Sequence, residues 1–71
     1  PMIKHQIILE HFDKMMEFYG RRGVPIFRKH THTYSKGYAG ASALRNRVNR
    51  IDDIDEFRVV LDTFFKESHL V

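Results

Sequence analysis

The chain has 71 residues, a net charge of +3 and no cysteine. This length allows a single domain with a small core, and the lack of cysteine excludes disulfides, cysteine chemistry and thiolate metal sites. No apolar run approaches the roughly 18 residues of a membrane span, and the charged N-terminus does not fit a secretory signal. A reducing compartment suits such a chain, and we expect it in the cytoplasm. Because the chain begins with Pro1 and not with methionine, we also expect it to derive from a longer protein.

A basic segment in the middle of the chain is its most unusual feature. Residues 21–50 hold eight of the twelve Lys and Arg residues and none of the nine Asp and Glu residues. The two flanks are therefore acidic. Such an asymmetry indicates an anionic partner, most often nucleic acid. The plainer interpretation is a solvated face that keeps the domain in solution.

The first predicted helix covers residues 3–19. Its apolar residues recur at the spacing of an amphipathic helix, and polar residues fill the other side. This stripe comprises Ile8, Phe12, Met15, Met16 and Tyr19. Gly20 follows in the position where a glycine commonly ends a helix.

A second helix is predicted to open at Gly23-Val24-Pro25, since proline in the first turn costs no hydrogen bond, and Gly37 and Gly40 end it and supply a loop. At about 100° per residue, this helix has two distinct faces. The aromatic face holds Phe27, His30, Tyr34 and Tyr38. The basic face holds Arg28, Lys29, His32 and Lys36. The two tyrosines could stack on bases, but the arc that they share with Phe27 favours core packing.

Two further helices complete the predicted fold. The third covers residues 41–49 and turns Leu44, Val48 and Ile51 inward. The fourth follows Asp53, which we expect to cap it, with Glu56 at the N3 position. Its apolar side holds Ile54, Phe57, Leu61, Phe64 and Phe65. We therefore predict an all-α fold, a small four-helix bundle with short connecting loops.

Metal binding and catalysis have little support in the sequence. His30 and His32 diverge by about 160° around one helix, so they cannot chelate one ion together. Neither a zinc-protease motif nor a Cys/His pattern occurs. His30 instead belongs on the partly buried aromatic face. No activated nucleophile and no glycine-rich phosphate loop is recognisable, so we predict no catalytic residue, no metal and no cofactor within this chain.

The basic segment is the strongest candidate for a binding surface. Lys and Arg neutralise phosphates and release counterions, and Arg can hold a phosphate through two hydrogen bonds. The candidate RNA-binding residues are Arg21, Arg22, Arg28, Lys29, His32, Lys36, Arg45, Arg47 and Arg50. They are spread over two helices and the turn before them. This distribution suits a broad surface for a nucleic-acid backbone better than one recognition helix in a DNA groove.

The order of several residues resembles the C-terminal helical domain of bacterial tRNA-dihydrouridine synthases. The likeness is closest to the B-type branch, the group once named for a nitrogen-regulation locus, and it covers roughly residues 10–65. It consists of His11…Tyr19-Gly20, Arg28-Lys29-His30…Tyr34…Gly37 and Leu44-Arg45…Val48-Asn49. Many members have an apolar residue, a glycine and a tryptophan after Arg-Lys-His, whereas this chain has Thr31, His32 and Thr33.

The resemblance implies that residues 1–71 are a single helical tRNA-binding domain, the C-terminal part of a longer flavoenzyme. Enzymes of this family reduce a uridine of tRNA to 5,6-dihydrouridine, with FMN in a TIM barrel, NADPH as reductant and a cysteine as general acid. Nothing of that barrel is present here. The resemblance makes Arg28, Lys29 and Arg45 RNA-facing or groove-shaping residues, and His30 and Asn49 structural ones. The implied partners are tRNA and the catalytic barrel of the parent chain, with neither a membrane nor a metal.

Two alternatives stay open on the residues. The chain could be a helical module that binds duplex DNA. It could also be a docking domain whose basic face contacts an acidic protein surface, for example that of its own catalytic barrel. Only the resemblance, and not the charge pattern, distinguishes tRNA from these partners.

Overall fold

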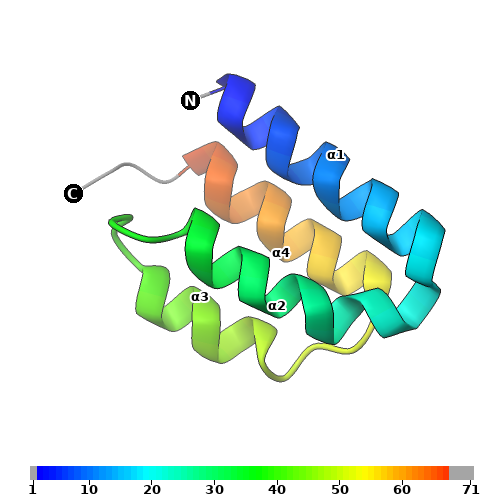
Figure 1. The fold of residues 1–71 in the computed structure, drawn as a ribbon. Coiled ribbons are helices and arrows are strands. Elements are labelled where there is room, and N and C mark those ends of the chain that lie inside the picture. Colours follow the sequence, from blue (N-terminus) through cyan, green and yellow to red (C-terminus); the bar gives the residue numbers. More distant parts are fainter. Residues whose placement is uncertain (1, 68–71) are drawn as a thin grey trace.

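Helices form almost all of the protein in a computed structural model, which describes residues 2–67. The elements are α1 (Met2–Tyr19), the 3₁₀ helix η1 (Gly20–Arg22), α2 (Gly23–Tyr34), α3 (Ala41–Val48) and α4 (Ile54–Glu67) (Figure 1). The predicted all-α class is confirmed, and each predicted helix coincides with an observed one to within a few residues. The 3₁₀ turn between α1 and α2 was not predicted, because a run of three residues carries no periodicity of its own.

The long helices α1, α2 and α4 run alongside one another and enclose the core (Figure 1). The remaining helix, α3, has only eight residues and packs against α2 and α4 at one side. The prediction of a four-helix bundle is therefore confirmed in its helical class, but α3 is too short to run the length of the others. The molecule is better described as three long helices that are flanked by a short one. In residues 2–67, no helix has the length and apolarity that crossing a bilayer requires.

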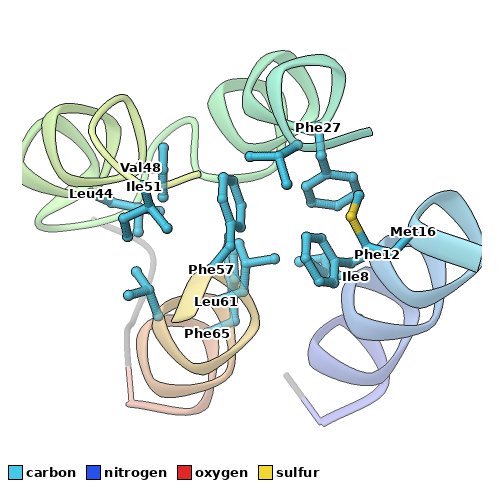
Figure 2. Close-up of a cluster of buried hydrophobic side chains, with 12 residues drawn as sticks. Ile8, Phe12, Met16, Phe27, Leu44, Val48, Ile51, Phe57, Leu61 and Phe65 are labelled. Atoms are coloured by element: carbon cyan, nitrogen blue, oxygen red, sulfur yellow. The ribbon is translucent and has the colours of Figure 1, made fainter. Parts of the chain in front are cut away.

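The core contains side chains from every α-helix (Figure 2). The predicted inward positions Leu44, Val48 and Ile51 are buried, as are most of the stripes of α1 and α4. The stripe prediction was wrong at Tyr19, which is 46% exposed. Tyr19 is the last residue of α1, and its ring packs on the exposed ring of Phe18 instead of on the core.

Two glycines allow the tight turn from α1 into α2. Gly20 has a φ of +63°, a left-handed conformation that residues with a Cβ atom adopt only at a cost. Gly23 serves a different purpose, since a Cβ atom there would lie 2.7 Å from Cε of Met16 and 3.2 Å from the carbonyl oxygen of Met15. The absence of a side chain at Gly23 therefore lets the start of α2 pack directly onto α1.

The predicted cap of α4 is present. The backbone N–H of Glu56 donates to a carboxylate oxygen of Asp53 at 2.8 Å. Asp55 and Glu56 also place negative charge in the first turn of α4, where the helix dipole favours it. These acids are thus explained by the local needs of the helix.

Replacing Asp53 by alanine removes this capping bond. We expect Asp53→Ala to lower the free energy of unfolding by about 1 kcal/mol, whereas Asp53→Asn retains a capping oxygen and most of the stability. Urea denaturation followed by circular dichroism measures both. Asp55→Ala is the control, because its side chain makes no capping bond. A loss as large in Asp55→Ala as in Asp53→Ala would contradict the capping role.

Candidate nucleic-acid interface

The exposed face of α2 and the turn after it carry three of the predicted site residues. Lys29 and His32 are exposed on the side of the helix opposite its buried residues, and Lys36 is exposed in the turn that follows Tyr34. The buried side consists of Gly23, Val24, Phe27 and Thr31. None of these three basic side chains forms a salt bridge within residues 2–67. They therefore present a row of positive or ionisable groups to solvent.

Arg28 does not belong to that row. Its side chain is only 21% exposed and points towards the end of α3. Its Nε donates to the carbonyl oxygen of Val48 at 3.0 Å, and one terminal nitrogen donates to the carbonyl oxygen of Ile51 at 2.8 Å and to Asp52 at 2.9 Å. Arg28 thus ties α2 to the segment between α3 and α4. Of the two roles that the resemblance implies, the observed contacts match the shaping of the surface.

The arginines of α3 divide between two sides of that helix. Arg47 and Arg50 line a hollow next to the start of α4, together with Asn46 and Glu56. Arg45 is partly buried and lies about 160° around the helix from Arg47. Arg45 therefore faces away from Arg47, and we group it with the basic residues of the neighbouring α2.

Arg21 and Arg22 in η1 form a third group. Both are exposed. Arg21 lines a shallow hollow with Asp52, Asp53 and Asp55, so acidic side chains surround it. Eight of the nine residues that the sequence brings together in one segment are thus distributed over three surfaces, and the ninth, Arg28, lies between helices. Lys29, His32, Lys36 and Arg45, which we call the α2–α3 basic face, form the largest of them.

Two acidic residues, one on α1 and one on α4, each pair with a side chain of the other helix. The guanidinium of Arg58 donates to both carboxylate oxygens of Asp13, at 2.7 and 2.8 Å. These hydrogen bonds lower the pKa of Asp13 and raise the pKa of Arg58. On the same pair of helices, His5 lies 2.6 Å from a carboxylate oxygen of Asp62. The carboxylates of Asp13 and Asp62 are therefore paired between α1 and α4.

A polar aromatic cluster joins α1 to α2, and sequence analysis missed it. Nδ1 of His11 lies 2.8 Å from the Tyr34 hydroxyl, and the His11 ring packs on the rings of Phe27 and His30. As predicted, His30 is partly buried on the aromatic face. Lys4 adds a hydrogen bond to the carbonyl oxygen of Tyr34. Only the aromatic half of this cluster had a signal in the sequence, namely the shared arc of Phe27, His30 and Tyr34.

Metal ligands are not assembled in the described part of the chain. Among residues 2–67, no group of three or more His, Asp or Glu side chains is arranged to hold a metal ion. Two of the histidines instead take part in hydrogen bonds, His11 with Tyr34 and His5 with Asp62.

Comparison with known proteins identifies relatives for nearly the whole chain. A protein of Helicobacter pylori strain J99 named "Probable tRNA-dihydrouridine synthase" is 49% identical over 69 residues, which are 97% of this chain and 21% of that protein. This chain is related to part of a tRNA-dihydrouridine synthase. Proteins of the same name from Rickettsia bellii (41% identical) and, as synthase 1, from Synechocystis (38% identical) match 75% and 86% of this chain, but 17% of their own lengths.

The chain therefore spans about a fifth of the length of its synthase relatives. It corresponds to one small part of such an enzyme. No profile of a known protein family matches the chain. No solved structure matches it either.

The residues that carry the likeness to the synthases have different surroundings in the fold. Arg28 is a tie between helices and Lys29, next to it, is exposed. Leu44 is buried in the core, Arg45 is partly buried and Asn49 is exposed. The motif thus combines structural and surface positions, and only the structure separates them.

Removing the guanidinium of Arg28 tests its role as a tie. Arg28→Met keeps most of the apolar stem but removes three hydrogen bonds, two of them to backbone carbonyls, so we expect a loss of about 1–3 kcal/mol in the free energy of unfolding. Lys29→Met removes a neighbouring exposed charge and should change stability by less than about 0.5 kcal/mol. Urea denaturation compares the two. Equal stability of both variants would refute the structural role of Arg28.

The α1–α2 cluster predicts a pH dependence of stability. Burial, and next the repulsion from His30, hold the pKa of His11 below its ordinary value of 6.5. The unfolded chain therefore binds the His11 proton more readily than the folded chain does. The stability that neutral His11 contributes is complete above pH 6.5 and is lost as the pH falls from there through the lower pKa of the folded state.

We therefore expect the native chain to lose stability between about pH 7.5 and about pH 5.5, and His11→Gln to lose less over the same range. His32→Gln is the control, since this histidine is exposed and should leave the pH dependence unaltered. Thermal unfolding at several pH values measures all three proteins. A His11→Gln profile parallel to that of the native chain would contradict the assignment.

Proposed function

We propose that this chain is the tRNA-binding domain of a tRNA-dihydrouridine synthase. The observation that carries the proposal is the 49% identity of nearly the whole chain to one fifth of a relative with that name. The exposed α2–α3 basic face supplies a physical reason for such a role. In this proposal the domain is the C-terminal part of a longer cytoplasmic enzyme, its helices act as one bundle, and the domain orients tRNA towards the catalytic part.

The α2–α3 basic face would bind the sugar–phosphate backbone of the tRNA. Lys29, Lys36 and Arg45 each neutralise a phosphate and release counterions, and His32 can donate a hydrogen bond to a phosphate oxygen. These contacts supply affinity without reading the sequence. Such binding would suit a domain that recognises many different tRNAs, because phosphate contacts depend on the shape of the folded RNA and not on its sequence.

Arg28 would contribute to this surface indirectly. Its hydrogen bonds to the carbonyl oxygens of Val48 and Ile51 hold the end of α3 at a set distance from α2. The spacing between the charges of the two helices therefore depends on a residue that does not itself need to contact RNA. Arg21 and Arg22 lie at one end of α2 and would extend the surface only where the tRNA reaches beyond that helix.

The chemistry would belong to the remainder of the parent enzyme. A catalytic barrel outside this chain would hold FMN and supply the reduction of a tRNA uridine with NADPH as reductant. The hollows found in residues 2–67, including the apolar one beside Phe64, are open to solvent, whereas an isoalloxazine ring needs an enclosed slot. We therefore place both cofactors outside this chain and derive no catalytic step from its residues.

A specific observation supports contact with the catalytic part of the parent chain. On α1, Ile3, Ile7 and Phe18 are 71%, 51% and 80% exposed. Side chains of this kind on one helix commonly mark a protein interface. This α1 surface is distinct from the α2–α3 basic face. A domain that docks through α1 would thus keep its basic face available for RNA.

Charge reversal on the basic face tests the proposal. We expect Lys29→Glu, Lys36→Glu and Arg45→Glu each to lower the affinity for unmodified tRNA by roughly tenfold at low salt. If about four phosphates are engaged, the native log–log salt slope is about −3 to −4, and each reversal makes it shallower by about 1. Titration of tRNA at several salt concentrations measures both quantities.

Lys14→Glu is the matched control, because it makes the same change in net charge at an exposed position of α1. It should alter tRNA affinity much less than the three reversals. An equal loss from all four variants would mean that net charge, and not this face, decides binding. Tighter binding to a duplex DNA of equal charge would favour the DNA-binding alternative, and binding to neither would favour a docking face.

A further inference from the structure

A groove runs between α3 and α4, on the side of α3 that faces away from the α2–α3 basic face. Two neighbouring hollows form it, and both are lined by Ala43 and Arg47. The first hollow is completed by Ala39, Gly40, Leu44, Val60, Thr63 and Phe64. The second is completed by Asn46, Arg50, Ile51 and Glu56. Because they share two lining residues, the hollows lie side by side, and we treat them together as one groove.

Small residues keep this groove open. Ala39, Gly40 and Ala43 line the first hollow together with Phe64. Gly40 has a φ of +81°, and a Cβ atom there would lie 3.6 Å from Cε1 of Phe64. The backbone before α3 therefore lies beside an aromatic ring with no side chain between them. Larger residues at these three positions would fill the depression.

The two ends of the groove differ in chemical character. The first hollow, of about 340 Å³, is mainly apolar and has the partly exposed ring of Phe64 in its wall. The second hollow is flanked by the exposed guanidinium groups of Arg47 and Arg50, and neither forms a salt bridge within residues 2–67. Arg47 lies between the two ends, whereas Glu56 lines only the second. An anion is therefore best accommodated near Arg47.

We propose that this groove binds one unpaired nucleotide of an RNA, with the base in the apolar hollow against Phe64 and its phosphate at Arg47. The inference rests on the proposed RNA-binding function and adds a second surface to it. A base gains from contact with an aromatic ring whatever its identity, and arginine suits a phosphate through paired hydrogen bonds. Arg50 would contact a neighbouring phosphate.

The dimensions favour a nucleotide over an acidic helix of a protein partner. A helix is about 10 Å wide and binds through several apolar anchors spaced along a groove. Here the apolar part ends at Arg47, and it contains a single aromatic ring, three small residues and two aliphatic side chains. This space suits one planar base. Since α3 separates the groove from Lys29 and Arg45, one RNA could place a paired segment on the basic face and an adjacent unpaired nucleotide in the groove.

Ala43→Leu tests the groove, because Ala43 is exposed and lines both hollows. The added side chain should fill the base site without disturbing the core. The probes are a short unstructured RNA oligonucleotide and a fully paired RNA duplex of the same length. We expect Ala43→Leu to lower the affinity for the oligonucleotide by about tenfold and to leave duplex affinity unchanged. Ser42→Leu is the matched control, since Ser42 is exposed, adjacent and outside the groove.

The outcomes separate this inference from the proposed function. Circular dichroism first establishes that both variants are helical. If Ala43→Leu binds the oligonucleotide as the native chain does, or if Ser42→Leu loses as much affinity, the groove is not a nucleotide site and the inference is overturned. The α2–α3 basic face then stands unaffected. If the native chain binds neither RNA, the proposed function itself fails. If Ala43→Leu loses only the binding of an acidic helical peptide, the groove belongs to a protein partner and the inference is overturned.

Discussion

The rings of Phe12, Phe27 and Phe57 meet at the centre of the molecule, one from each of the long helices (Figure 2). Phe12 and Phe57 stack at 5.4 Å, and Phe27 meets Phe12 edge-on at 5.1 Å. All three side chains are fully buried. A chain of 71 residues has only one small core, so the relative placement of α1, α2 and α4 depends largely on this contact. The basic residues of α2 point outward because Phe27 sets the rotation of that helix.

The position of α3 depends on a second, polar constraint. This short helix contributes only two buried residues of its own, Leu44 and Val48, and a helix of two turns has little intrinsic stability. Arg28 compensates by donating three hydrogen bonds to the segment that ends α3. One arginine of the basic segment thus has a structural role, which fixes the position of α3. On its other side α3 borders the groove beside α4.

The success and failure of sequence analysis follow from the range of the interactions involved. Helix positions, the Asp53 cap and the inward residues of α3 depend on local spacing, and all of them were predicted correctly. Tyr19 was misplaced because periodicity alone does not show where a helix leaves the core. For Arg28, sequence analysis left open whether the residue contacts RNA or shapes the groove. Its hydrogen bonds join residues 20 or more positions apart, and local spacing does not reveal such contacts. The His11–Tyr34 bond, with a similar separation, had no signal at all.

By itself, the sequence determined that the protein is helical, that its middle third is strongly basic, and that its residues resemble one part of the tRNA-dihydrouridine synthases. Each of these depends on composition or on spacing within one helix. The tertiary structure alone decided which of the nine candidate residues share a surface. Residues close in sequence, such as Arg45 and Arg47, diverge because a helix turns by about 100° per residue. Residues far apart, such as Arg28 and Val48, come together because the shared core and the hydrogen bonds of Arg28 join α2 to α3.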